Sequence, residues 1–294
     1  MNALRVALIT LLLALCLPVQ AAQTLVVLPG HSGLTDAFIA ELQTALGRSV
    51  EVATSDDSDL PAQPSYRQII TMGQKALNWR LRQSAQIRTF ATYLTGEYWH
   101  PRSQDAPPWL HVLYANPKPA RQLQLSRTLM PRLDRAGMLL TPATAWQRTG
   151  WLRAAERLNI ELIVAELDKP DELSRQLLGL IGQSDLLIGT DDSNIYNADN
   201  LKTILLTSYS RNKVLIGPSA PFIDAGSLST TYSSPEDMAR SVAYLIEQGA
   251  PPNAASYPRY FSVLSNTQVA RSLGIPLPDD ATLARRLAEL EQEP

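Results

Sequence analysis

The feature that most constrains this chain is a repeated pattern in which a short apolar run breaks off into glycine, proline and small polar residues. Helix-like segments alternate with most of these runs. Continuous rather than alternating hydrophobicity is typical of strands covered on both faces, which means parallel strands joined by helical crossovers. The runs are Leu25 to Leu28, Ile69 with Ile70, Phe90 to Leu94, Gly137 to Leu140, Leu186 to Ile188 and Val214 to Ile216. The pattern predicts an α/β fold built on mainly parallel sheets flanked by helices.

The polar clusters that follow these runs predict where a ligand binds. In open parallel sheets, ligands lie outside the carboxyl ends of the strands. Helix N-termini favour anions, so we expect a ligand carboxylate near Ser32 and Thr71 and a ligand amine near Asp191 or Asp192. Each residue type also serves as an ordinary cap or turn, so their recurrence on successive strand ends is what favours a site. The predicted ligand-binding residues are Ser32, Thr71, Gln74, Thr95, Thr144, Trp146, Asp191, Asp192, Asn194 and Ser219.

The first 21 residues read as an export signal. Arg5 precedes an apolar stretch from Val6 to Leu17, and small residues occupy the cleavage positions before Ala21. The stretch is shorter than the roughly 20 apolar residues needed to span a bilayer. We expect cleavage after Ala21 or Ala22 and a periplasmic product. Cys16 is the only cysteine and follows Leu15 rather than a small residue, so we expect no lipidation and no thiol in the mature chain.

Composition and motif spacing argue against several other classes of function. The chain has 26 basic and 28 acidic residues and no basic block, which excludes a nucleic-acid-binding domain. Its 3 histidines lack H-x-x-x-H spacing, and Asp191-Asp192 has no nearby third acidic partner, so we expect no metal. No G-x-G-x-x-G or phosphate loop is present, so we expect no cofactor.

The loop Gly30-His31-Ser32-Gly33 permits an enzyme hypothesis, because it follows a strand and precedes a helix. A nucleophile elbow would require glycine at position 34, where this chain has Leu34. Hydrolysis through Ser32 is therefore the third hypothesis, and we expect a protein without catalytic residues.

Two series of strand and helix segments predict two lobes. The first ends near Asn116-Pro117-Lys118-Pro119, and the second begins at Gly137. We expect a signal peptide at 1–21, one lobe from 22–117 with about 233–255, and the other from 118–232 with about 262–294. An irregular loop is expected at 98–108 and a proline-rich link at 251–258.

Several stretches of the chain also carry a family resemblance. They run from Leu129-Met130-Pro131 through Gly137-Met138-Leu139-Leu140, then Gly189-Thr190-Asp191-Asp192, Ala225-Gly226 with Tyr232, and Val263-Leu264-Ser265-Asn266 through Leu273-Gly274-Ile275-Pro276. Together they resemble the ABC-transporter substrate-binding family of the tryptophan/tyrosine type, within the type I periplasmic binding fold. The resemblance implies two lobes joined by three chain crossings, with a ligand captured between them by closure. The segment 98–108 departs from the family's usual loop.

The leading hypothesis is accordingly a monomeric periplasmic solute-binding receptor. It would capture a small ligand, such as an aromatic or other amino acid, and deliver it to an inner-membrane ABC permease and its ATPase. The alternative hypothesis is a periplasmic ligand-sensing accessory protein for a membrane sensor or uptake system.

Overall fold

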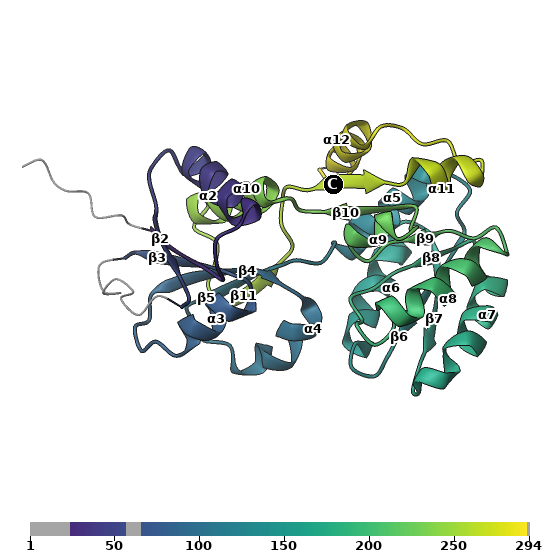
Figure 1. The fold of residues 1–294 in the computed structure, drawn as a ribbon, viewed down its shortest axis with the longest axis horizontal. Helices are drawn as coiled ribbons and strands as arrows, with labels where there is room; N and C mark the ends of the chain where they lie inside the picture. Colours follow the sequence, from purple (N-terminus) through teal and green to yellow (C-terminus); the bar gives the residue numbers. More distant parts are fainter. Residues whose placement is uncertain (1–23, 57–65, 293–294) are drawn as a thin grey trace, which may run out of the picture.

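Two six-stranded sheets, each flanked by helices, form two lobes that lie side by side in Figure 1. The computed structural model describes residues 24–56 and 66–292. The predicted signal peptide lies outside the described residues. Within them, the expected α/β architecture with mainly parallel sheets is confirmed.

The first sheet is parallel at every described strand pair and has the order β11-β5-β4-β3-β1-β2. Its strands are β1 (Thr24–Leu28), β2 (Glu51–Thr54), β3 (Gln68–Met72), β4 (Arg88–Leu94), β5 (Leu110–Tyr114) and β11 (Ala254–Ser256). The proline-rich link expected at 251–258 therefore contains an edge strand. Three residues of small side chains give too weak a strand signal in sequence.

Alternate residues of the first sheet pack on opposite faces, which explains its continuous hydrophobic runs. Val26 and Ile70 face α2 (Gly33–Leu46) and α10 (Pro235–Glu247), whose apolar sides meet in one core. Leu25 and Ile69 face α3 (Gly73–Leu81) on the other side. Figure 1 shows α2 and α10 packed together above the sheet, although the sequence separates them widely.

The second sheet has the order β12-β10-β9-β8-β6-β7 and is parallel except for the β10–β12 pair. Its strands are β6 (Arg135–Leu140), β7 (Glu161–Glu166), β8 (Leu186–Ile188), β9 (Leu215–Ile216), β10 (Ser229–Tyr232) and β12 (Ser262–Ser265). Met138 and Ile188 pack on one face, and Leu139 and Leu187 on the other.

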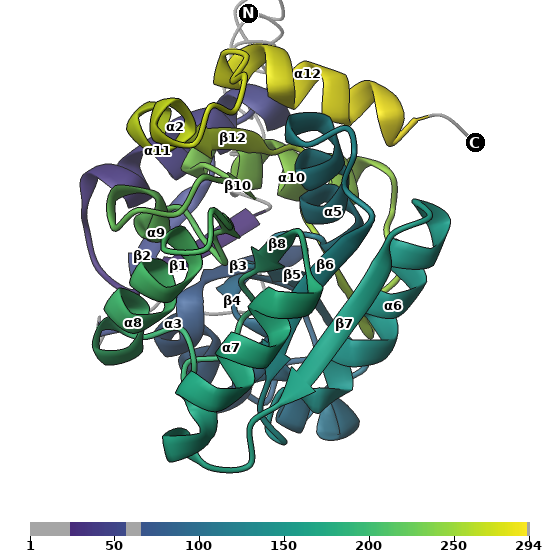
Figure 2. The ribbon, with the colours of Figure 1, turned by 90° about the vertical axis from the view of Figure 1, so that its right-hand side faces the viewer.

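Seven α-helices of the described chain belong to the second lobe. They are α5 (Pro119–Leu129), α6 (Arg148–Arg157), α7 (Leu173–Gln183), α8 (Ala198–Tyr209), α9 (Pro221–Asp224), α11 (Thr267–Ser272) and α12 (Asp280–Leu290). Short 3-10 turns, η3 (Ala145–Gln147) and η4 (Pro170–Glu172), precede α6 and α7. Figure 2 shows α12 lying across the top of this lobe. None of the helices in the described ranges is long and apolar enough to cross a membrane.

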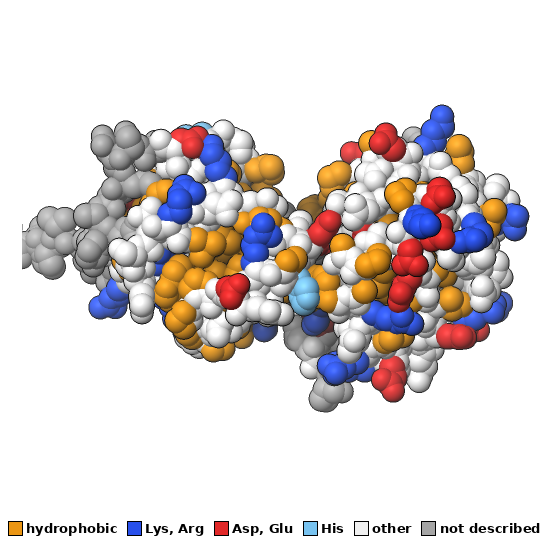
Figure 3. Space-filling view, turned by 90° about the horizontal axis from the view of Figure 1, so that it is seen from below, with side chains coloured by type: hydrophobic (Ala, Val, Ile, Leu, Met, Phe, Trp, Pro, Cys, Tyr) orange, Lys and Arg blue, Asp and Glu red, His pale blue; other side chains and the backbone are white. Residues whose placement is uncertain are grey.

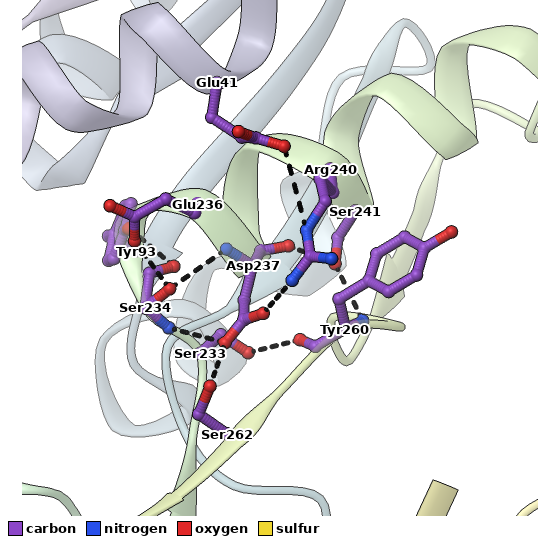
Figure 4. A network of polar contacts seen from close by, with 10 residues as sticks. All are labelled: Glu41, Tyr93, Ser233, Ser234, Glu236, Asp237, Arg240, Ser241, Tyr260 and Ser262. Carbon is purple, nitrogen blue, oxygen red and sulfur yellow. Dashed lines mark hydrogen bonds and ion pairs between the residues drawn. The ribbon is translucent and has the colours of Figure 1, made fainter. Parts of the chain in front are cut away.

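The chain crosses between the sheets three times: from β5 to α5, from β10 to α10, and from β11 to β12. A buried carboxylate joins the last two crossings (Figure 4). Asp237, in the first turn of α10, accepts hydrogen bonds from the Ser234 amide, the Ser262 hydroxyl and the Arg240 guanidinium. The α10 N-terminus is thereby fixed to both crossing segments.

A second ion pair anchors α12 to the first crossing. Arg121, in α5, is nearly fully buried and forms a bidentate pair with Glu291, with both N–O distances at 2.9 Å. Its guanidinium also lies over the Phe261 ring. Burial acts to raise the pKa of Glu291, but the hydrogen bonds and charges of Arg121 and Lys118 together hold it below its ordinary value.

The segment expected as an irregular loop is partly helical. It contains α4 (Gly96–Trp99) and the 3-10 helix η2 (His100–Asp105). The Thr95 hydroxyl caps α4 by accepting from the Tyr98 amide. Trp99 is buried in a cluster with Leu94 and Leu110, which holds this short segment against the sheet. Tertiary packing thus overrides a local sequence rich in proline and polar residues.

Candidate functional site

A pocket lies between the two lobes, at the carboxyl ends of the strands. It consists of two adjoining chambers that share Asn116, Thr190, Asp191 and Pro218, and we call them together the interlobe pocket. The larger chamber has room for about 190 Å³ and the smaller for about 20 Å³, the space of a single water. Figure 3, seen from below, shows how the molecule narrows where the lobes meet.

Both lobes and two of the crossings line this pocket. The smaller chamber is lined by Gly96, Tyr114, Asn116, Pro117, Pro119, Gln122, Trp146, Gln147, Trp151, Gly189, Thr190, Asp191, Pro218 and Tyr257. The larger chamber is lined by Thr95, Ala115, Asn116, Thr190, Asp191, Asp192, Ser193, Tyr196, Pro218, Ser219 and Phe222. The only ionisable acids and bases with ordinary charge at neutral pH among these residues are two aspartates. The pocket is therefore acidic, and each chamber includes aromatic side chains.

Glycine 189 explains how the loops after β8 and β9 come together on the pocket wall. A Cβ atom at Gly189 would lie 2.5 Å from Pro218 Cδ and 2.9 Å from Pro218 N. Only glycine permits this approach of two backbones. The approach places Thr190 and Asp191 beside Pro218 and Ser219.

Asp191 of the second lobe contacts the first lobe directly. Its Oδ2 accepts a hydrogen bond of 2.9 Å from the amide of Glu97. Burial raises the pKa of Asp191, and the nearby Glu97 carboxylate raises it too, while hydrogen bonds from Glu97, Asn116 and Gly96 oppose the shift. No described ion pair gives Asp191 a cationic partner. Its negative charge is held by neutral donors alone.

Asp192 has a different role. It is 1% exposed, and its carboxylate accepts from the amide and hydroxyl of Thr141, the hydroxyl of Thr144 and the amide of Asn194. These bonds tie the loop after β8 to the loop after β6. A carboxylate satisfied in this way organises the pocket wall and has little capacity left for a ligand.

Glu97 extends from α4 to the second lobe. Its Oε1 accepts from the Ser193 hydroxyl at 2.7 Å, and its Oε2 accepts from the Ser193 amide at 3.2 Å. Together with the bond from the Glu97 amide to Asp191, this makes a reciprocal contact between the lobes. We call this set of contacts the Glu97 bridge.

Aromatic side chains form the rest of the wall. Trp146 stacks on His100, and the buried Nε1 of its indole has no hydrogen-bond partner. The rings of Tyr114 and Tyr257 lie with centroids 5.2 Å apart. Burial, with smaller effects of Tyr114 and Asp191, raises the pKa of Tyr257 to about 12, so this phenol is neutral at physiological pH.

The structure brings only some of the predicted residues together. Thr95, Trp146, Asp191, Asp192 and Ser219 line the interlobe pocket. Asn194 lines a separate hollow of about 250 Å³ beside Thr141 and Asp168. Among the pocket-lining predictions, Asp191 has no cationic partner in the described ion pairs, and the buried Nε1 of Trp146 has no hydrogen-bond partner.

The other four predicted residues line neither chamber. Ser32 caps α2 through a reciprocal capping box with Thr35, which occupies its hydroxyl. Thr71 is buried in β3 and its hydroxyl has no partner. Gln74 lies exposed on α3, and Thr144 bonds Asp192. The carboxylate position expected near Ser32 and Thr71 is therefore outside the pocket that the described residues form.

Sequence reasoning missed several residues of the pocket. Asn116, which lines both chambers, and Glu97, which bonds the pocket residue Ser193, had a usable signal, because each lies shortly after the end of a predicted strand. Tyr257 lies in the link between β11 and β12 and had none. Gln122 is buried in α5, where it donates to the Gly217 carbonyl and accepts from the Thr231 amide, so it supports the pocket floor. Within the described residues, no group of three or more potential ligands could hold a metal ion.

Comparison with known proteins identifies the fold. No family model and no curated protein matches the sequence. The ligand-free, open structure of CD0873, a substrate-binding protein with adhesive properties from Clostridium difficile, matches with a TM-score of 0.65 and 12% identity, over 88% of this chain and 97% of that one. An ABC domain in complex with L-Trp from Streptococcus pneumoniae matches with a TM-score of 0.51 and 14% identity, over 88% and 96%.

A conserved domain protein from Vibrio cholerae matches with a TM-score of 0.52 and 16% identity, over 90% of this chain and 98% of that one. At these identities the likeness concerns the fold alone. This chain has the two-lobed, periplasmic-binding-protein-like fold, as the sequence predicted. The narrower tryptophan/tyrosine family stays a prediction.

Proposed function

We propose that this chain is a periplasmic solute-binding receptor that captures a small ligand between its lobes and delivers it to an ABC importer. The observation that supports this most directly is the interlobe pocket, whose walls come from the strand ends of both sheets. Three crossings connect the lobes beside it. A rotation of the lobes about these crossings would change all ligand contacts at once, which is how closure is coupled to binding.

The state of Ser32 favours binding over catalysis. An activated serine needs a base within hydrogen-bond reach. The Ser32 hydroxyl instead bonds within its own helix cap, to the amide and hydroxyl of Thr35. The proposal therefore assigns no chemical step to this residue.

The pocket also suggests the kind of ligand. In the larger chamber Asp191 offers a negative charge, and Tyr196 and Phe222 offer aromatic surface. A small molecule with an amine and an apolar group fits these features. The L-Trp complex of the structurally similar ABC domain is consistent with a ligand of this general kind.

Native mass spectrometry and thermal unfolding of the protein purified from its own cells test the proposal. We expect a small molecule to co-purify, and the same molecule to raise the unfolding temperature of the stripped protein. At 100 times the dissociation constant, the gain in stability is about 2.7 kcal/mol. Asp191→Asn should reduce this gain. Asp134→Asn should not, because Asp134 directly precedes the amino end of β6, whereas the pocket lies at the carboxyl ends of the strands. Turnover of an ester or amide that Ser32→Ala abolishes would contradict the receptor.

Localisation and partner are tested separately. Cell fractionation should place the processed protein in the periplasm, with its first residue near Ala22 or Gln23. Crosslinking of the ligand-loaded protein should capture an inner-membrane permease. Capture of a sensor kinase in its place would favour the accessory function.

A further inference from the structure

We propose that the interlobe pocket takes a small organic amine that lacks a carboxylate, rather than an amino acid. This inference rests on the proposed receptor function and specifies its ligand class. Three features support it: the sign of the pocket's charge, the use of the paired Ser193 donors by Glu97, and the aromatic residues of the larger chamber.

The charge of the pocket favours a cation. No lysine, arginine or histidine lines either chamber, and Asp192 is satisfied by loop hydrogen bonds. Asp191 is left as a partly buried carboxylate without a cationic partner. Burying a charge is unfavourable unless it is paired, so a ligand ammonium beside Asp191 supplies the missing partner.

The paired donors of Ser193, which suit a carboxylate, are already in use. The Ser193 amide and hydroxyl both bind the Glu97 carboxylate, one to each oxygen. An amide and a hydroxyl arranged in this way would also hold the carboxylate of a ligand. An amino acid would have to displace Glu97 or place its own carboxylate near Asp191 and Glu97, where like charges repel. An amine without a carboxylate meets neither obstacle.

The aromatic wall suits the same ligand class. The larger chamber, which has the room for such a ligand, is lined by Asp191 and by the aromatic residues Tyr196 and Phe222. An ammonium over the face of an aromatic ring is attracted by the ring quadrupole. An aromatic or branched apolar group attached to the amine would pack against the remaining ring surface.

Matched pairs that differ only by the carboxylate test the inference. The probes are phenethylamine with phenylalanine, tyramine with tyrosine, tryptamine with tryptophan, and isoamylamine with leucine. Each is titrated into the full chain by calorimetry and thermal shift. We expect at least one amine to bind about tenfold or more tightly than its amino acid, a difference of about 1.4 kcal/mol.

Two variants and one control test which residues determine this preference. Asp191→Asn should abolish binding of the amine. Glu97→Ala should free the Ser193 donors and so narrow the difference between amine and amino acid, while Glu156→Ala, an exposed residue of α6, should leave it unchanged.

The outcomes separate this inference from the receptor function. An amino acid that binds as well as or better than its amine overturns the ligand class and leaves the receptor standing. A co-purified molecule that carries a carboxylate has the same meaning. If no probe binds and no small molecule co-purifies, both proposals are overturned.

Discussion

His100 of the first lobe stacks on Trp146 of the second, with ring centroids 4.2 Å apart and planes within 9° of parallel. The contact lies on the short helical segment that follows β4, as does the Glu97 bridge. The lobes are therefore held together in two ways: covalently through three crossings, and non-covalently through this segment. Because a ligand that moves the lobes must change both connections, we expect substitutions in the crossings or in this helical segment to change ligand binding.

Replacing Gly96 should separate the lobes. A Cβ atom at this position would lie 2.8 Å from Trp146 Cη2 and 3.5 Å from Asp191 Oδ2. We expect Gly96→Ala to displace the indole, increase the radius of gyration in solution scattering, and weaken ligand binding about tenfold. Gly150→Ala is a matched control, since nothing lies within 4 Å of its added methyl group. An unchanged radius and affinity in Gly96→Ala would show that the contact does not hold the lobes.

Asp191 should decrease stability at neutral pH. Its folded pKa lies above the ordinary value of 3.8, because of burial and of Glu97, so the folded state binds more protons than the unfolded state. Stability therefore falls as the pH rises through the window above 3.8. We expect ligand-free Asp191→Asn to unfold at the same or a higher temperature than the unmodified protein at pH 7. Thermal unfolding at pH 7 and pH 4 checks this, and the difference should shrink at pH 4.

His111 should give the opposite pH dependence. Its ring is 4% exposed and bonds the Pro251 carbonyl through Nδ1 and the Ser256 hydroxyl through Nε2. The carbonyl only accepts, so Nδ1 carries the proton and Nε2 accepts from Ser256. Burial, aided by Arg88 and opposed by the Pro251 bond, lowers the pKa of His111 below its ordinary 6.5.

The unfolded state consequently binds more protons just below pH 6.5, and stability is lost as the pH falls through that window. One such group contributes a slope of at most about 1.4 kcal/mol per pH unit. Urea unfolding between pH 7 and 5.5 should show this decline, and His111→Gln should flatten it. A decline of equal slope in the variant would assign the pH dependence to other groups.

Asp237 should stabilise the crossings. It is 2% exposed, and its removal leaves the Ser234 amide, the Ser262 hydroxyl and the Arg240 guanidinium without their acceptor. A lost cap and unsatisfied partners together predict a decrease of about 2 to 4 kcal/mol in the free energy of unfolding of Asp237→Ala. Chemical denaturation measures it, and exposed Asp224→Ala should change stability by less than about 0.5 kcal/mol. A loss as small as that of the control would remove Asp237 from this role.

The sequence predicted the fold well because short but continuous apolar runs mark many of its strands. Strands such as β1 and β6 are buried on both faces, so their residues alone reveal parallel pairing. β11 was missed because Ala254–Ser256 has no apolar run, and its pairing with β5 depends on residues far away in the chain. A local sequence pattern does not indicate which distant strand will pair with a short segment in the folded protein.

The site was harder to predict for a related reason. Thr95, Asp191 and Ser219 follow strands that the sequence located, and all three line the interlobe pocket. Ser32 and Thr144 have the same local signal, but one caps a helix and the other bonds a buried carboxylate. Strand-end residues share an edge of the sheet, and only the packing of the loops decides which of them face a ligand.

The last two strands have a consequence for the order in which this molecule can form. β11 completes the edge of the first sheet and β12 the edge of the second, and both lie after residue 253. A ribosome must therefore pass residue 253 before either half acquires its final edge. Newly made chains should stay sensitive to proteases until both strands have been made, and then gain resistance in both halves together.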